Sequence, residues 1–350
     1  MQRRAYVVVL GLCVAAASWV SALPAAAESP YEAYKEIYQP IPALPPIPAD
    51  NSLTEQRVAL GQMLYWDRRT SKTGQTSCGF CHHPAYYGAE PMARSLGVFG
   101  DLHAANSHTV LNAAYHPDGF FFSGSAATLE DQALGAIRSH VAARSWPEEV
   151  AERLNRIPGY RELSRQAYGE DLNEEVIGKA IASFMRTLVT PDYPLARWLR
   201  GDDNAMTEQQ KRGMALFADR GCVACHAPPY FSNFTYQKFI IEGGEHHLGR
   251  YTVTKDEADK FTYKVPSLLN VAKTPPYTHA GVVKSLPEMV RIMGKQMLQE
   301  DLSDAEVEDV VAFLDALTGK MPQHFQVIPV LPIGGGDGDF GPELTPSTKE

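Results

Sequence analysis

The sequence predicts a mainly helical protein built from two similar modules, and three observations support this. The pentapeptide pattern Cys-x-x-Cys-His occurs twice, at 78–82 and at 222–226. A helix-start signal followed by apolar residues at helical spacing precedes each copy, over 52–65 and 207–217. No strong run alternates polar and apolar residues as a half-buried strand would. Each half of the chain is therefore expected to form a helical module around its own pentapeptide.

The helices expected before the two pentapeptides correspond to each other. Ser52-Leu53-Thr54-Glu55 is expected to act as a capping box for the first helix, and Thr207-Glu208-Gln209-Gln210 to cap the second. Equivalent positions follow at the same spacing, which indicates a duplicated unit. They are Gly61, Leu64 and Tyr65 in the first helix and Gly213, Leu216 and Phe217 in the second.

The domain organisation follows from where helical periodicity stops. A long helical stretch over 174–188 closes the first half, and the segment 191–203 before the second cap is expected to be the junction. We therefore predict one domain over 28–195 and a second over 196–333. Residues 334–350 are rich in Gly, Pro and acidic residues without periodicity, which indicates a flexible tail.

Residues 1–27 are typical of a secretory signal peptide. Arg3 and Arg4 precede an apolar run over 5–20, and the small residues 25–27 form a cleavage-like exit. The run is short for a membrane span, so no transmembrane segment is expected after cleavage. Cleavage would remove the fifth cysteine and leave only those of the pentapeptides. We expect a protein exported to the periplasm or the cell surface.

The charge balance restricts the partners. The chain carries 32 basic and 41 acidic residues, a net charge of −9, and loss of Arg3 and Arg4 would make it −11. An acidic surface argues against nucleic acid and favours a basic or dipolar partner such as a small cytochrome. The alternative is that the acidity only keeps the protein soluble.

The two pentapeptides predict two covalently attached haem c groups. Two thiols three positions apart can bond the two vinyl groups of one porphyrin, and the adjacent histidine can ligate its iron. A zinc site or a thioredoxin-like dithiol would not require a histidine after both cysteine pairs. The expected attachments are Cys78 and Cys81 for the first haem and Cys222 and Cys225 for the second, with His82 and His226 as axial ligands.

Further segments form an ordered series between about residues 53 and 332. They are Asn-Ser-His-Thr-Val-Leu-Asn-Ala at 106–113, Leu-Glu-Asp-Gln-Ala at 129–133, Val-Pro-Ser-Leu-Leu-Asn-Val at 265–271, Pro-Tyr-Thr-His at 276–279, Ile-Met-Gly at 292–294 and Val-Val-Ala-Phe-Leu at 310–314. With the two pentapeptides they resemble the bacterial dihaem cytochrome c peroxidases and their relative MauG. The resemblance implies two mostly helical cytochrome c-type domains, with a peroxide-binding haem in the first and an electron-accepting haem in the second.

The resemblance also implies a sixth ligand for the second haem. Met293 stands at the Met-Gly position that supplies this ligand in the similar peroxidases, whereas MauG has a tyrosine there. A thioether ligand closes the iron and raises its reduction potential, which suits electron transfer. The alternative is that Met289, Met293 and Met297 form an ordinary core stripe on one helix.

A calcium ion between the domains is a further implication of the resemblance. Asn106, Thr274 and Pro276 occupy the positions that hold calcium in the similar peroxidases through one amide side chain and backbone carbonyls. The residues alone carry no signature of such a site. The alternative is a loop asparagine that caps its own backbone.

The first haem pocket departs from the family pattern at three positions. Val98 stands where a loop histidine closes the resting haem, and Ala142 stands where a glutamate is the acid/base group. Phe122 replaces the tryptophan between the haems. Of the distal set, Gln132 is retained. The first haem is therefore expected to be open or differently ligated, with weakened proton and electron relays.

Three explanations for these departures stay open. His140 or His103 could replace the glutamate, because an imidazole can shuttle protons near neutral pH. Glu148 or Glu149 could reach the pocket, although they look like an exposed helix start. Alternatively, peroxidase activity has been lost. The stretch that holds His103, His108, His116 and His140 could also supply a ligand to the first iron.

The favoured expectation is an oxidoreductase that reduces hydrogen peroxide at the His82 haem. Electrons would enter through the His226/Met293 haem from a small periplasmic donor, a cytochrome c or a cupredoxin. A second hypothesis is MauG-like oxidation of a tryptophan or tyrosine on a partner protein. A third is a non-enzymatic dihaem electron carrier or sensor. The protein could assemble as a homodimer.

Overall fold

The fold is mainly helical, as predicted, in a computed structural model that describes residues 29–117 and 119–334. The expected signal peptide, 1–27, and all of the expected tail except Gly334 lie outside the described residues. The helices are α1 (Glu55–Trp66), α2 (Cys78–Cys81), α3 (Leu129–Arg138), α4 (Pro147–Asn155), α5 (Pro158–Tyr168), α6 (Glu174–Met185), α7 (Pro194–Leu199), α8 (Glu208–Asp219), α9 (Tyr251–Thr254), α10 (Leu286–Met293) and α11 (Asp304–Asp315). The strands are β1 (Tyr236–Lys238) and β2 (Thr262–Lys264).

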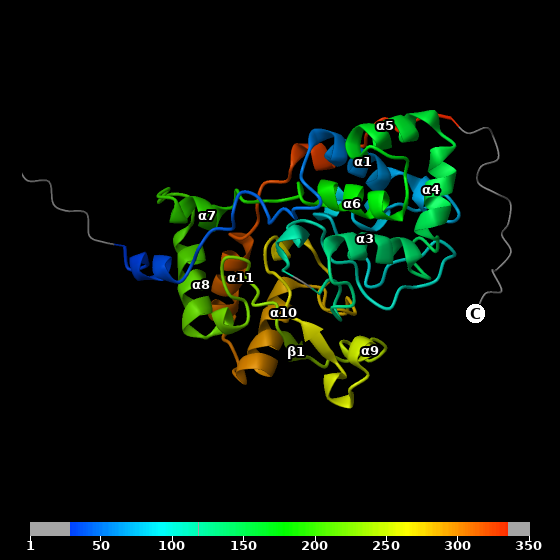
Figure 1. Cartoon of the computed structure of the whole chain (residues 1–350). Helices are drawn as coiled ribbons and strands as arrows, with labels where there is room; N and C mark the ends of the chain where they lie inside the picture. The colour runs from blue at the N-terminus through cyan, green and yellow to red at the C-terminus, as the bar shows by residue number, and fades with distance from the viewer. Residues whose placement is uncertain (1–28, 118, 335–350) are drawn as a thin grey trace, which may run out of the picture.

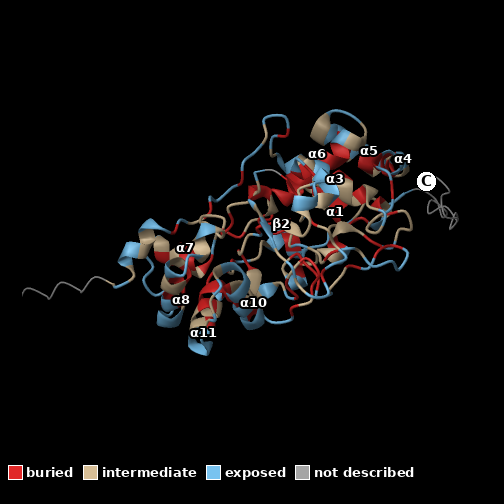
Figure 2. Ribbon diagram, turned by 90° about the horizontal axis from the view of Figure 1, so that it is seen from below, coloured by how far each residue is buried: buried red, intermediate tan, exposed pale blue. Residues whose placement is uncertain are grey.

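The longer helices form two groups that lie side by side (Figure 1). One contains α1 and α3 to α6, and the other contains α7, α8, α10 and α11. Each group encloses its own cluster of buried apolar side chains, and buried segments run through the interior of both groups (Figure 2). The expected division into two helical cytochrome c-type units therefore agrees with two separate hydrophobic cores.

Each group is centred on a pair of helices that cross at a glycine. A Cβ atom on Gly61 of α1 would lie 1.9 Å from the carbonyl oxygen of Ala180 in α6. A Cβ atom on Gly213 of α8 would lie 1.8 Å from the carbonyl oxygen of Asp309 in α11. Only a residue without a side chain permits this approach. The correspondence of the two glycines in the sequence is thus a correspondence of two helix crossings.

The starts of α1 and α8 differ from each other. The predicted capping box at Thr207 is present, since Thr207 and Gln210 each accept a hydrogen bond from the other's backbone N–H. The predicted box at Ser52 is wrong, because Thr54 is the N-cap and accepts from the Arg57 N–H at 3.3 Å. Ser52 instead accepts from the Arg57 guanidinium at 3.0 Å, so its hydroxyl is not available as a cap.

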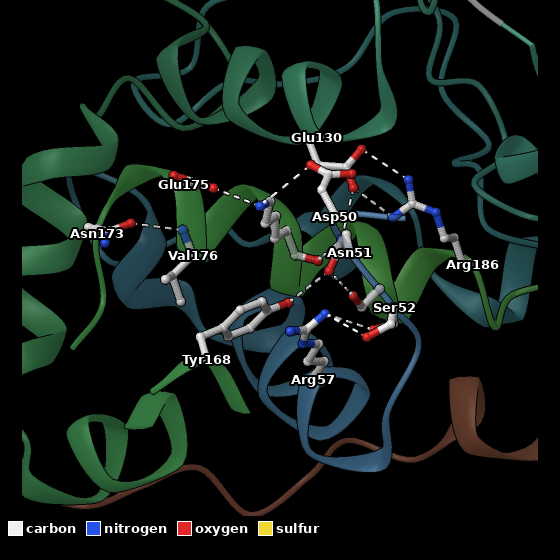
Figure 3. A network of polar contacts seen from close by, with 12 residues as sticks. Asp50, Asn51, Ser52, Arg57, Glu130, Tyr168, Asn173, Glu175, Val176 and Arg186 are labelled. Atoms are coloured by element: carbon white, nitrogen blue, oxygen red, sulfur yellow. Dashed lines mark hydrogen bonds and ion pairs between the residues drawn. The ribbon is translucent and has the colours of Figure 1, made fainter. Parts of the chain in front are cut away.

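A buried polar network fixes the helices of the first group (Figure 3). The Asn51 amide donates to Glu130 at 2.8 Å and to the Lys179 carbonyl at 2.9 Å. Glu130 of α3 also accepts two hydrogen bonds from Arg186, at 2.7 and 3.0 Å. Burial would raise the Glu130 pKa, but the hydrogen bonds from Arg186 and Asn51 outweigh it and lower the pKa. The first segment of the chain, α3 and α6 are therefore joined through one carboxylate.

Both ends of the described chain cross between the groups. Tyr38 and Ile41 pack in the second core, and the Tyr38 hydroxyl donates to the Met214 carbonyl at 2.8 Å. Phe325, near the other end, is buried in the first core. Helix α7 spans the expected boundary at 195/196, which stays a prediction.

The two short strands connect the groups near the expected inter-haem position. β1 and β2 pair antiparallel, with Tyr236 opposite Lys264. The Lys264 N–H donates to the Phe122 carbonyl at 3.1 Å, so β2 is tied to the first half of the chain. Among the described residues, none of the helices combines the length and apolar character needed to cross a membrane.

Candidate functional site

The two Cys-x-x-Cys-His motifs fold into matching turns. The His82 N–H donates to the Cys78 carbonyl at 3.0 Å, and the His226 N–H donates to the Cys222 carbonyl at 2.9 Å. The four cysteines are half-buried and none of them forms a disulfide within the described chain. Each turn therefore presents two free thiols beside a histidine, which is the arrangement that covalent haem attachment requires.

The thiols do not resemble a redox dithiol. Burial raises the pKa of Cys78 to about 11 and that of Cys222 to about 11, and burial raises the pKa of Cys81 to about 12. A thioredoxin-like nucleophile needs a lowered pKa instead. A zinc site is not formed either, because residues 29–117 and 119–334 contain no group of three or more His, Cys, Asp or Glu side chains able to hold a metal.

The His82 ring is held for ligation through its far nitrogen. Its Nδ1 lies 3.0 Å from the Gly88 carbonyl oxygen, so Nδ1 carries the proton and Nε2 keeps a free lone pair. Burial lowers the His82 pKa, which favours the neutral imidazole that binds iron. The Tyr65 hydroxyl donates to the His82 carbonyl at 2.7 Å, which ties the turn to α1.

The His226 ring is held by two carbonyls. Its Nδ1 lies 3.2 Å from the Phe231 oxygen and 3.2 Å from the Pro266 oxygen. Burial lowers the pKa of this histidine as well. Both histidines thus have the second hydrogen bond that orients an axial ligand, and the thiol pairs and imidazoles fit a haem c group at each turn.

The three methionines expected on one helix do not form a single buried stripe. Met289 packs against the second core, whereas Met297 is 38% exposed. Met293 is the last residue of α10; it is half-buried and is not among the side chains packed on that core. Its thioether is therefore not committed to core packing, and Met293 stays a predicted ligand.

The structure brings the departures Val98 and Ala142 into neighbouring loops. Val98 is buried, and its N–H donates to the Val141 carbonyl at 3.0 Å. The preceding Gly97 lies so close to this loop that a Cβ atom would be 2.2 Å from the Val141 oxygen. Neither Val98 nor Ala142 carries an atom that could ligate iron or transfer a proton.

The proposed replacements for the pocket acid are spread over several elements. Gln132 lies half-buried in α3, His140 is exposed after that helix, and His103 is half-buried. The His103 Nδ1 accepts from the Ala105 N–H at 3.3 Å. Glu148 and Glu149 are exposed in the first turn of α4, which begins at Pro147. Glu148 and Glu149 therefore lie at an exposed helix start, as expected. Neither carboxylate contacts the His82 turn.

An aromatic cluster surrounds Phe122, and the sequence did not indicate all of it. The His108 ring centroid lies 3.6 Å from that of Phe122, and the rings of His247 and Tyr263 lie 5.9 and 6.5 Å away. Tyr263 stacks on His279 at 4.0 Å. His247 and Tyr263 were missed because they come from a separate region of the second half, and a His-His pair at 246–247 was their only sequence signal.

His108 links the His82 turn to this cluster. His108 is an exposed residue, yet the protein atoms around its ring lower its pKa to about 3, with smaller contributions from His116 and His82. The His108 backbone also lies beside the His82 ring. A lowered pKa favours the neutral imidazole, which can both donate and accept a hydrogen bond.

The three residues implied for calcium lie in two adjoining loops. The Asn106 N–H donates to the His279 carbonyl at 2.8 Å, which places Asn106 against the loop that begins with Thr274 and Pro276. The Asn106 amide also donates to the Met92 carbonyl at 2.7 Å, which leaves its side-chain oxygen as an acceptor. One amide oxygen and neighbouring carbonyls are hard ligands that suit calcium.

The two helical cores and paired Cys-x-x-Cys-His turns define a c-type cytochrome with two modules. A family profile described as "Di-haem cytochrome c peroxidase" matches residues 55–204, and one described as "Cytochrome c" matches residues 210–318. The chain is 38% identical over 290 residues to the cytochrome c peroxidase of Escherichia coli K12, covering 80% of this chain but only 62% of that longer protein.

Other relatives match over almost their whole length. The chain is 34% identical to the cytochrome c551 peroxidase of Pseudomonas aeruginosa, with 85% of this chain and 89% of the relative covered. It is 31% identical to the methylamine utilization protein MauG of Methylophilus methylotrophus, with 91% and 96% covered. A solved MauG-like protein associated with microbial copper homeostasis shares the fold, with a TM-score of 0.73 at 24% identity over 83% of this chain and 97% of that one.

The chain therefore belongs to the dihaem cytochrome c peroxidase and MauG family. Its two cytochrome c-type domains imply two haem c groups, as the paired pentapeptides predicted.

Proposed function

We propose that the protein is a periplasmic dihaem oxidoreductase that reduces hydrogen peroxide at the His82 haem, with electrons entering through the His226 haem from a small redox protein. The observation that carries the proposal is the asymmetry between the two sites. The position at which the family resemblance implies a loop ligand for the first haem holds the buried, non-ligating Val98. The position at which it implies a ligand for the second haem holds Met293, the last residue of α10, whose side chain is not packed in the second core.

The residues around the two turns would serve the two haems in different ways. His82 and His226 orient their Nε2 atoms through hydrogen bonds from Nδ1 to backbone carbonyls. The bound haem iron would supply peroxide binding at an open site and one-electron transfer at a closed one. The hydrogen bond from Lys264 to Phe122 joins the segment that orients His226 to the segment expected between the haems.

Ala142 limits the proposed peroxide reaction. A positioned acid or base contributes about 10²–10⁴-fold to such a proton transfer, and a methyl group contributes none. We therefore propose ready ligand binding at the first haem but weak turnover with an ordinary cytochrome c. His103 and His140 are the candidate substitutes. The first is half-buried and the second is exposed, so His103 is better placed for an enclosed proton transfer.

The test compares the natural protein with Ala142→Glu in steady-state peroxide reduction by reduced cytochrome c. Faster turnover in the substituted protein supports both the pocket assignment and the peroxidase activity. If the natural protein already turns over equally fast, another residue supplies the proton, and His103→Ala and His140→Ala identify it. If both proteins bind peroxide without turnover, the peroxidase proposal is wrong.

A second candidate function is oxidation of a tryptophan or tyrosine on a partner protein. The match to a MauG protein over nearly the full length of both chains favours it, as does the absence of the expected acid at Ala142. A peroxide-dependent mass change on a partner incubated with the holoprotein would establish this function. An unchanged partner, together with rapid peroxide turnover, would reject it.

We also propose a calcium ion at Asn106, Thr274 and Pro276. The adjoining loops and the free Asn106 oxygen support it. The haem-loaded protein, stripped of calcium, should bind one calcium ion in a titration. The Asn106→Ala variant should bind it more weakly. Equal binding by both proteins would reject the assignment.

A further inference from the structure

A buried carboxylate lies next to the first haem turn and has no part in the function proposed above. Glu90 is 6% exposed. The chain leaves the Cys78–His82 turn, reverses, and returns alongside it, with the His83 N–H donating to the Ala89 carbonyl at 3.3 Å and the Gly88 N–H to the His83 carbonyl at 3.0 Å. The same reversal carries Gly88, whose carbonyl orients His82, and places Glu90 near Cys81.

The partners of Glu90 are hydroxyl groups. The Ser107 hydroxyl donates to Glu90 Oε1 at 3.1 Å, and the Ser107 and Ser95 hydroxyls lie 2.5 Å apart. No Lys, Arg or His of residues 29–117 and 119–334 forms an ion pair with Glu90. A buried carboxylate without a cation is costly, and hydroxyl donation offsets only part of that cost. A negative charge on Glu90 would therefore act on its surroundings without a counter-charge from a side chain of those residues.

Glu90 lies beside the end of the first haem turn. Ala89 pairs with His83, directly after the turn, and Glu90 is the next residue. The second turn has a different environment. Glu300, which lies near Cys222, is paired with Arg220 at 2.8 Å.

We propose that Glu90 is an electrostatic positioning residue that lowers the reduction potential of the haem attached at Cys78 and Cys81. The inference rests on the proposed haem attachment at this turn. A fixed negative charge favours the oxidised iron, which carries one more positive charge than the reduced iron, and a low-dielectric interior strengthens the effect. The N-terminal haem would therefore be harder to reduce. At the second turn, Glu300 is paired with Arg220, and Asp219 is exposed and accepts from the Tyr34 hydroxyl.

The experiment is a spectroelectrochemical titration of the mature holoprotein, with both haems resolved, for the natural protein, Glu90→Gln and Glu90→Asp. Glu90→Gln keeps the shape and removes the charge. At an effective dielectric of about 20, one unit charge at about 10 Å changes a one-electron equilibrium on the order of tenfold. We expect the N-terminal haem of Glu90→Gln to become about tenfold easier to reduce, which corresponds to about 59 mV. The C-terminal haem should not change.

Glu90→Asp separates charge from packing. It keeps the negative charge but shortens the side chain, so the potential should stay near that of the natural protein even if the hydrogen bond to Ser107 is weakened. Glu300→Gln is the matched control at the second turn and should leave the N-terminal potential unchanged.

Two results would overturn the proposal. One is an unchanged N-terminal potential in Glu90→Gln with both haems attached, and the other is an equal shift in Glu90→Asp and Glu90→Gln. The haem content, measured by mass spectrometry, reports separately on the attachment on which the inference rests. Peroxide turnover is not needed for the measurement, so failure of the proposed peroxidase activity would not affect it.

Discussion

The two modules share a helix crossing and a haem-type turn but are stabilised in different ways. In the first module Glu130 and the buried Arg186 form a bidentate pair, with the Arg186 side chain 5% exposed, and Glu130 also binds Asn51. In the second, Arg212 of α8 and Asp309 of α11 form a pair of similar geometry, but Arg212 is 53% exposed. Exposed pairs contribute little because solvent screens them.

The surroundings of the two turns differ in the same sense. His82 is oriented by one carbonyl from its own loop, and buried Glu90 lies nearby without a cation. His226 is oriented by two carbonyls, one of them from Pro266 in the segment tied to Phe122. The common fold thus provides the turn, and the side chains around it differ, in line with the proposal that one site binds the ligand and the other transfers electrons.

Removal of either cysteine pair tests whether the modules are equivalent in haem attachment. The variants Cys78→Ala/Cys81→Ala and Cys222→Ala/Cys225→Ala should each carry one covalent haem, because each turn holds its own thiols. Mass spectrometry of protein matured with the haem-attachment machinery measures this directly. Two haems on either double variant, or none on the natural protein, would contradict the assignment.

Met293→Ala tests the difference in axial ligation. Loss of the thioether should abolish methionine ligation at one haem and lower its potential, because the thioether favours ferrous iron. Met297→Ala is the matched control, since Met297 is exposed on the next turn. The sulfur-to-iron charge-transfer band should vanish in the first variant alone, and its persistence there would exclude Met293.

Glu130→Gln tests the buried pair of the first module. Buried Arg186 would lose its counter-charge, which costs about 3–5 kcal/mol when a fully buried pair is broken and less here, because Glu130 is 19% exposed. The folded-state pKa of Glu130 is lowered, so its stabilisation is present above the unfolded value and is lost as the pH falls through the folded value.

Urea unfolding from pH 7 to pH 3 measures both effects. The natural protein should lose more of its free energy of unfolding toward pH 3 than Glu130→Gln does. The exposed Glu208, paired with Lys211, provides the control Glu208→Gln. Parallel pH dependences for the natural protein and Glu130→Gln would exclude the role of Glu130.

Alanine at the two crossing glycines tests the structural equivalence. A new methyl group in either crossing overlaps a backbone carbonyl of the facing helix, and overpacking of this kind costs about 1–3 kcal/mol. Gly61→Ala and Gly213→Ala should therefore lower the free energy of unfolding. Gly135→Ala should be neutral or stabilising, because its nearest neighbour is the Phe121 ring at 3.6 Å. A neutral result at only one crossing would show that the two are not equivalent.

The sequence predicted the features that depend on local spacing. The Cys-x-x-Cys-His turns, the cap at Thr207 and the paired positions Gly61 and Gly213 all depend on residues a few positions apart, and the structure has them. The cap at Ser52 was wrong because Thr54 is the N-cap, and the Ser52 hydroxyl accepts from the Arg57 guanidinium five residues away. The spacing pattern does not distinguish between two neighbouring hydroxyl groups that could each cap the helix.

The parts of the site that the sequence did not predict depend on long-range contacts. Glu90 is buried where it accepts from the Ser107 hydroxyl, 17 residues further along the chain. His247 and Tyr263 reach Phe122 from the other half of the chain, a separation of more than a hundred residues. Periodicity carries no information about such approaches, and a lone acid or aromatic residue has no signature of its own.

The proposed function requires that, in the fully oxidised protein, the N-terminal haem lacks a sixth ligand from the protein and the C-terminal haem has one. Cyanide titration of the oxidised holoprotein, followed by optical and electron paramagnetic resonance spectra, tests it most directly. We predict that one equivalent binds at the His82 haem without prior reduction, while the Met293-ligated spectrum stays unchanged. The account would be contradicted if cyanide bound only after one haem had been reduced, because another residue would then ligate the first iron in place of the histidine that Val98 replaces.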